Sequence, residues 1–270
     1  MPTLPIYQVD AFTRTLFAGN PAAVVPLDDW LADAVMLTIA AENNLAETAF
    51  FVAQGENRWG LRWFTPEIEV PLCGHATLAT AFVLCECLGV KAERLTFATR
   101  ESGELTVTRE RDGRFVMRLP IRRPEPAGAF ADLSDALGKA PSEVHFADVA
   151  GDASYLAVFD TEADVRALDP DLRAVAALDA RNVVVTAKGG DVDFVSRMFA
   201  PAAGIDEDPV TGSAHCMLAP FWGERLGKSV LSARQVSKRG GDLWCEIDGE
   251  TIVVSGHGVL YLEGRIHVPA

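Results

Sequence analysis

The first half of the chain alternates apolar and polar residues in short stretches that are separated by turn residues. This two-residue period is typical of strands with one buried face, and Asp112-Gly113 is a strong hairpin signal. The stretch that ends near residue 43 follows a helical spacing instead. Asp28 or Asp29 is expected to cap this helix at its N-terminus. The pattern predicts strands over residues 6–12, 22–26, 48–53, 60–64, 93–99, 103–110 and 114–119.

The second half shows a similar order of elements. Its pattern predicts a helix near 133–137, strands over 155–159, 182–187 and 192–199, and three or four closing strands. Between the halves, residues 120–129 contain three prolines and are the best linker candidate. Strands and helices in this order predict an α+β architecture in which each half wraps a mostly antiparallel sheet around a central helix.

A repeated segment supports this division into halves. Residues 62–89 begin R-W-F-T-P and end in a sixteen-residue apolar stretch from Gly74 to Gly89, and residues 197–227 begin R-M-F-A-P and end in a matching stretch from Gly212 to Gly227. The second copy has three extra residues in its loop. Because there are only two copies, we interpret them as a duplicated strand–loop–helix unit rather than as a solenoid.

Composition narrows the function classes. The net charge of −14 disfavours nucleic acid and anionic membranes as partners, and no apolar stretch is long enough to span a bilayer. The first ten residues do not resemble a secretory signal, and five cysteines do not make a disulfide framework, so we expect a cytoplasmic protein. The five histidines have no metal-ligand spacing, and no metal is expected.

The two repeat loops are candidate anion sites. A helix N-terminus presents unpaired backbone N–H groups and partial positive charge, and a glycine there lets a ligand approach closely. Gly74 and Gly212 occupy these positions, and His75 and Ser213 follow them with side chains that could bond an anion. We therefore expect a small carboxylate or phosphate to bind here. The alternative is that the glycines only permit tight turns.

Two carboxylates stand out beside these loops. Glu47 lies next to a stretch that reads as a buried strand, and apolar surroundings raise the pKa of a carboxyl toward the range of a general acid/base. Asp208 lies four residues before Gly212 in E-D-P-V-T-G-S. Each also has a structural interpretation, Glu47 as a surface residue at a strand start and Asp208 as a turn or capping residue.

At these residues the chain resembles the phenazine-biosynthesis PhzF-like proteins, which have the diaminopimelate epimerase fold. The resemblance covers nearly the whole length. The motifs that carry it are V-D-A-F with G-N-P-A-A-V (9–24), N-L-A-E-T-A-F (44–50), F-T-P with C-G-H-A-T (64–77), R-M-F-A-P with E-D-P-V-T-G-S-A (197–214) and S-G-H-G-V (255–259).

The resemblance implies two similar domains, residues 1–122 with a last strand at about 259–270 and residues 123–258, with an active site in the cleft between them. It implies a cofactor-free isomerase, commonly a homodimer, acting on a small carboxylate such as trans-2,3-dihydro-3-hydroxyanthranilate. Ala46 and Cys73 replace a serine and an alanine of the phenazine enzyme, so its substrate is not carried over directly. By resemblance, Glu47 shuttles the proton, His75 and Asp208 assist it, and Gly74, Gly212 and Ser213 bind substrate.

Two other functions stay open. Epimerases and racemases of this fold use two thiols, one in each repeat loop, and Cys73 occupies the first thiol position. Loop alignment places Pro209 at the second position, where it can act neither as acid nor as base, which disfavours a two-thiol mechanism. The other alternative is a non-catalytic protein that binds small molecules, since a fold alone does not define an activity.

Overall fold

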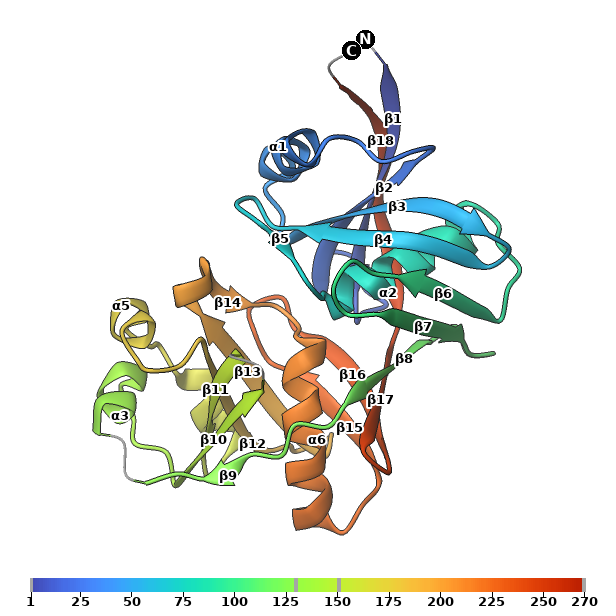
Figure 1. The fold of residues 1–270 in the computed structure, drawn as a ribbon. Coiled ribbons are helices and arrows are strands. Elements are labelled where there is room, and N and C mark those ends of the chain that lie inside the picture. The colour runs from blue at the N-terminus through green and yellow to red at the C-terminus, as the bar shows by residue number, and fades with distance from the viewer. Residues whose placement is uncertain (1, 129–130, 150–151, 269–270) are drawn as a thin grey trace. The chain divides into compact units, whose positions relative to one another are not determined.

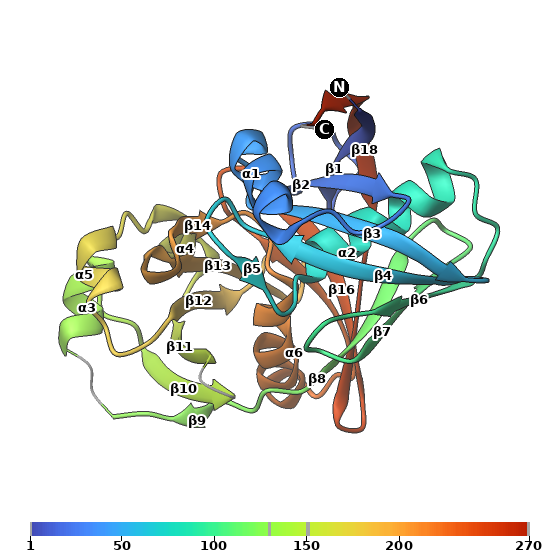
Figure 2. The ribbon, with the colours of Figure 1, turned by 45° about the horizontal axis from the view of Figure 1, so that its top comes forward.

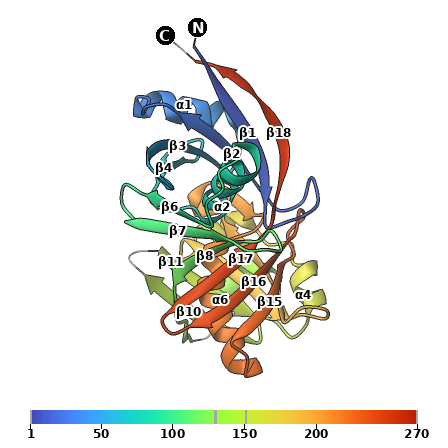
Figure 3. The ribbon, with the colours of Figure 1, turned by 90° about the vertical axis from the view of Figure 1, so that its right-hand side faces the viewer.

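The computed structural model describes residues 2–128, 131–149 and 152–268. The chain forms two compact units, the first comprising Met1–Arg118 with Ser255–Ala270 and the second Leu119–Val254. The first unit is therefore made of two stretches of sequence that flank the second unit. The boundaries predicted at residues 122 and 259 lie slightly beyond these. Figures 1, 2 and 3 show the elements of each unit from three sides.

The first unit is built on one mixed sheet. Its strands are hydrogen-bonded in the order β18-β1-β2-β3-β4-β6-β7-β8, with the short β5 added to β4. The β2–β3 and β4–β6 pairs are parallel. The strands are β1 (Thr3–Ala11), β2 (Asn20–Leu27), β3 (Glu47–Gly55), β4 (Arg58–Phe64), β5 (Glu69–Val70), β6 (Arg94–Ala98), β7 (Glu104–Arg109), β8 (Phe115–Pro120) and β18 (Gly258–His267).

The central helix of this unit is α2 (Gly74–Phe82), which continues into a π-helical turn, η1 (Val83–Cys87). Its residues from His75 to Ala81 are buried, and it packs against β1, β2 and β3. A helix enclosed by a sheet needs no polar face toward solvent, which explains why the first repeat stretch has no continuous polar face.

The outer helix α1 (Asp33–Asn43) starts later than the sequence predicted. Neither Asp28 nor Asp29 caps it: the N-cap is Ala32, which makes no side-chain cap bond, and the Asp29 carboxylate accepts from the N–H of Trp30 instead. The prediction was wrong because an aspartate can satisfy a neighbouring backbone N–H in a turn as readily as at a helix end.

The second unit repeats the first. Its sheet runs β9-β10-β11-β12-β13-β15-β16, with the β11–β12 and β13–β15 pairs parallel. The elements are β9 (Glu125–Pro126), α3 (Ala131–Leu137), β10 (Glu143–Val149), β11 (Asp152–Val158), α4 (Glu162–Ala167), α5 (Leu172–Ala176), β12 (Asn182–Lys188), β13 (Phe194–Ala200), the 3-10 turn η2 (Pro201–Ala203), β14 (Ile205–Asp208), α6 (Gly212–Leu226), β15 (Val230–Gln235), β16 (Gly241–Asp248) and β17 (Thr251–Gly256).

The sequence pattern did not predict β9, β10, β14, α4 or α5 in this unit. The two helices have six and five residues, so neither is long enough to establish a helical period. A capping box at Thr161 and Asp164 marks the start of α4 and was the available signal. No helix within the described residues combines the length and the apolar character that crossing a membrane requires.

The duplication includes an arginine–glutamate ion pair, which occurs once in each unit beside the loop that precedes the central helix. In the first unit Arg62 donates two hydrogen bonds of 2.7 Å to Glu69, and its guanidinium lies 5.1 Å from the Phe64 ring centroid. In the second unit Arg197 donates to Glu207 at 2.7 and 3.1 Å and lies 4.9 Å from the Phe199 ring centroid. The hydrogen bonds from Arg62 lower the pKa of Glu69. In each unit a bidentate arginine–glutamate ion pair therefore holds the loop against the strand that precedes it.

Candidate functional site

Three segments of the first unit bring polar side chains to one place. Asn20 begins β2 and Glu47 begins β3, and these parallel neighbours are in register with Ala22 opposite Glu47. The loop that leads into α2 adds Cys73 at the N-cap and His75 in the first turn. All four polar side chains are buried. The structure therefore brings together Glu47 and His75, two of the predicted catalytic residues.

His75 lies at the centre of this cluster. Its Nδ1 is 3.2 Å from Asn20 Nδ2 and 3.4 Å from Cys73 Sγ. Its other ring nitrogen, Nε2, is 3.2 Å from Glu47 Oε2. That last contact is close but is not aligned as a hydrogen bond. Catalytic hydrogen bonds are often poorly aligned without substrate and tighten when it binds.

The protonation of His75 follows from its surroundings. Burial lowers its pKa to about 3, so the imidazole is neutral at physiological pH. The Asn20 amide donates to Nδ1, which leaves the single ring proton on Nε2, the nitrogen that faces Glu47. A neutral donor beside a carboxylate orients it without neutralising it. His75 is therefore a neutral neighbour of Glu47, and its role in catalysis stays a prediction.

Asn20 was not identified from the sequence, although the motif G-N-P contains it. Gly19 has φ of +68°, and a Cβ there would lie 2.2 Å from the carbonyl oxygen of Ala11. Only glycine fits this turn, and the turn aims the next side chain at His75. The signal that could have identified Asn20 is its position directly after Gly19, a glycine that no other residue can replace.

A second polar cluster lies at the start of α6. Asp208 ends β14, and its carboxylate accepts a hydrogen bond from the hydroxyl of Thr211, the N-cap residue. The buried Gln235 accepts from the Thr211 N–H at 2.8 Å and donates to the Asp208 carbonyl at 2.7 Å. Asp208 is thus held in place by two neighbours, one of which, Gln235, had no signal in the sequence.

The three predicted substrate-binding residues lie at the starts of the two helices that the repeated segments predicted. Gly74 is the first residue of α2 and Gly212 the first of α6, and the side chain of Ser213 is exposed. Gly74 belongs to the first unit with Glu47 and His75, and Gly212 and Ser213 belong to the second with Asp208. The roles assigned to these residues stay predictions.

One alignment made from the sequence was wrong. Cys73 is the N-cap of α2, and the N-cap of α6 is Thr211, not Pro209. The three extra residues of the second loop fall in the turn after β13, before Glu207 pairs with Arg197, so Pro209 corresponds to Pro71. A threonine hydroxyl does not ionise near neutral pH as a thiol does, so a two-thiol mechanism stays disfavoured.

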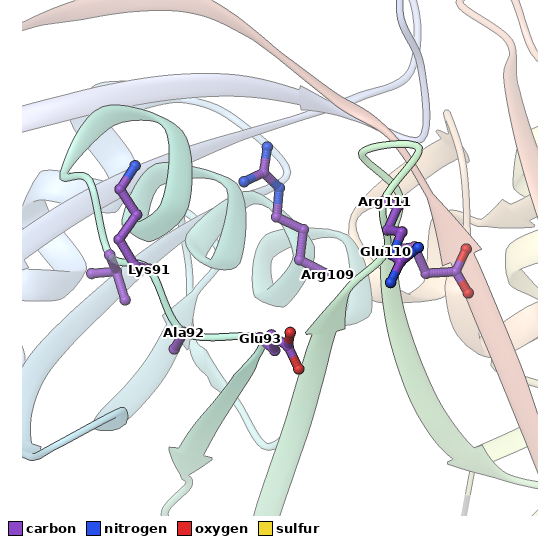
Figure 4. Close-up of a pocket in the computed structure, with 7 residues that line it drawn as sticks. Lys91, Ala92, Glu93, Arg109, Glu110 and Arg111 are labelled. Atoms are coloured by element: carbon purple, nitrogen blue, oxygen red, sulfur yellow. The ribbon is translucent and has the colours of Figure 1, made fainter.

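A hollow elsewhere in the first unit contains none of the predicted residues. It has a volume of about 290 Å³ and lies between the segment before β6 and the end of β7. Figure 4 shows the charged side chains that line it, among them Lys91, Glu93 and Arg109. Arg109 is paired with Glu86. Charges of both signs on an open surface do not select a ligand.

Comparison with known proteins identifies the family. The family model described as phenazine biosynthesis-like protein matches residues 9–264. The chain belongs to this family. A protein of Pseudomonas aeruginosa named as an uncharacterized isomerase is 52% identical over 266 residues, which cover 98% of this chain and 99% of that protein.

The solved structures agree. A PhzF-family protein of Enterococcus faecalis has a TM-score of 0.93 and 45% identity, covering 99% of this chain and 100% of the other. A predicted epimerase of Pseudomonas aeruginosa has a TM-score of 0.77 at 21% identity, covers 98% of this chain and 100% of that one, and supports the fold alone. The epimerase-like α+β fold and the enzyme class, an isomerase, are confirmed.

Proposed function

We propose that this PhzF-like isomerase moves a proton between two carbons of a small carboxylate substrate, with Glu47 as the shuttling group and no cofactor. The single observation that carries the proposal is the placement of Glu47 beside a neutral His75. Glu47 is 9% exposed and therefore nearly desolvated. A carboxylate in such a position can accept a proton from a substrate C–H group, and its acid form can return the proton to the same substrate.

The surrounding groups suit this task. The proton on His75 Nε2 faces Glu47 Oε2, so the imidazole would steady the carboxylate oxygen that is not taking the proton. The first N–H groups of α2 have no partner within the helix, and such groups at a helix N-terminus can bind a substrate carboxylate. A cyclic amino-carboxylate such as trans-2,3-dihydro-3-hydroxyanthranilate has the acidic C–H and the carboxylate that this arrangement requires.

The test is NMR of the enzyme with trans-2,3-dihydro-3-hydroxyanthranilate and a panel of small unsaturated amino-carboxylates in D₂O. We expect conversion or deuterium uptake with at least one of them, and a loss of about 10³-fold or more in Glu47→Gln, because removing a general acid/base forfeits 10² to 10⁴ in rate. Glu42→Gln is the matched control, since Glu42 is exposed on α1.

Binding must be measured alongside the rate. Glu47→Gln is expected to retain affinity for the substrate within a few fold, because the amide has the shape of the carboxyl group. Full turnover by Glu47→Gln would overturn the proposal. Retained turnover in Glu42→Gln with loss in Glu47→Gln would support it.

A further inference from the structure

We propose that Glu47, Cys73 and His75 form a zinc-binding site, and that Zn²⁺ bound there blocks the isomerase. The three ligand atoms, a carboxylate oxygen, a thiol sulfur and an imidazole nitrogen, all lie within 4.8 Å of one another. All three residues are buried. This mixture of oxygen, sulfur and nitrogen ligands is typical of zinc, and three protein ligands leave a fourth position open for water.

Binding of one tetrahedral ion requires a rearrangement of Cys73. With zinc–ligand lengths of about 2.0 to 2.3 Å, tetrahedral geometry separates a sulfur from a nitrogen by about 3.6 Å and a nitrogen from an oxygen by about 3.4 Å. Cys73 Sγ lies 4.0 Å from His75 Nε2, and Glu47 Oε2 lies 3.2 Å from the same nitrogen. Cys73 Sγ lies nearer to His75 Nδ1, at 3.4 Å, so a change of the Cys73 side-chain torsion is needed to bring the sulfur to the Nε2 side, where the three atoms can share one ion.

The neighbouring groups can accommodate the bound form. An ion on Nε2 moves the ring proton of His75 to Nδ1, where Asn20 lies 3.2 Å away. A half-turn of the Asn20 amide presents its oxygen to that proton, which gives the ligand the outer hydrogen bond that zinc-bound histidines usually have. Binding also releases the Cys73 thiol proton to solvent, because the thiolate is the ligand.

The consequence for activity rests on the proposed function. An ion coordinated by Glu47 takes the lone pairs that would accept the substrate proton, and it occupies the space beside the start of α2. Zinc should therefore inhibit in competition with substrate, and a chelator should restore the rate. Metal binding itself does not depend on the isomerase activity, so the two claims fail separately.

The experiment measures binding of the metal alone. Co²⁺, a spectroscopic substitute for Zn²⁺, is titrated into the full chain, and thiolate-to-metal charge transfer is followed by absorption, with Zn²⁺ added to displace it. Equilibrium dialysis with Zn²⁺ provides the stoichiometry. We expect one ion per chain, and affinity reduced about 100-fold or more in Cys73→Ser and in Glu47→Gln, since each removes a ligand. Serine is a favourable N-cap residue, so Cys73→Ser should fold.

Cys87→Ser is the matched control, because Cys87 lies in η1, outside the proposed site. Unchanged binding in Cys87→Ser, with loss in Cys73→Ser, would support the proposal. Tight binding that survives Cys73→Ser, or no charge-transfer band in the unsubstituted protein, would overturn it. Binding at this site without inhibition of a working isomerase would overturn the inhibitory role alone.

Discussion

The buried His215 should make the stability of this protein sensitive to acid. Its side chain is fully buried in α6, where Nδ1–H donates to the carbonyl of Thr211 at 2.8 Å and the ring lies 5.7 Å from that of Phe194. No hydrogen bond from the described part of the chain reaches Nε2. Protonation would place an unsolvated charge there, and burial lowers the pKa of His215 to about 4.

The direction follows from linkage. An unfolded histidine titrates near pH 6.5 and the folded one near pH 4, so the unfolded state takes up the proton first as the pH falls. The stability is complete above about pH 6.5 and is lost progressively toward pH 4. Between pH 7 and pH 5 the two pKa values correspond to a loss of about 2 kcal/mol in the free energy of unfolding.

The internal repeat supplies a control variant. Thr77 occupies the equivalent position of α2 and donates its hydroxyl to the carbonyl of Cys73 at 2.6 Å, as His215 donates to Thr211. His215→Thr should therefore keep the hydrogen bond and remove the titrating group. Its stability at pH 7 is expected to be lower, because the smaller side chain leaves a cavity.

The assay is urea denaturation of both proteins at pH 7 and pH 5, followed by far-UV circular dichroism. The remaining titrating groups are common to both proteins, so their contributions cancel in the difference. We expect the unsubstituted protein to lose about 2 kcal/mol more than His215→Thr between the two pH values. Equal losses in the two proteins, with unchanged denaturant slopes, would refute the reasoning.

Three further predictions concern the first unit. Gly19→Ala should cost at least about 2 kcal/mol in thermal or urea unfolding, because its Cβ would meet a backbone oxygen at 2.2 Å; Gly89→Ala, with nothing within 4 Å, should cost less. Asn20→Ala should lower kcat about 10-fold to 100-fold with little change in KM, because His75 loses its donor; an unchanged kcat would contradict that role. Glu69→Ala should destabilise by about 2 to 3 kcal/mol in urea, more than an exposed glutamate substitution would.

The sequence was informative where a pattern is local. The duplicated glycines predicted the first residues of both helices, Gly74 and Gly212, because a helix start needs only nearby residues. Glu47 was correctly placed at the start of a strand. The turn residues and the apolar stretches between them likewise predicted most of the strands in the first half, in the correct order.

What escaped prediction depends on distant contacts. Asn20 is 55 positions from His75, and Gln235 is 24 positions from Thr211, so no local motif joins either pair. The error at Pro209 had the same origin, since a three-residue insertion can be placed anywhere in a loop until the Arg197–Glu207 contact locates it. The cluster of Glu47 with Cys73 and His75 escaped a search for metal-ligand spacing for the same reason.

The pairing of β1 with β18 has a consequence for synthesis of the chain. Thr3 pairs with His267 and Ala11 with Gly258, so the first unit is completed by a strand that follows the whole second unit in the chain. The second unit, Leu119–Val254, is continuous and can fold while the ribosome is still adding β18. The residues around Glu47 are therefore made before the second unit, but their sheet is complete only after it, which makes β18 a checkpoint for a competent enzyme.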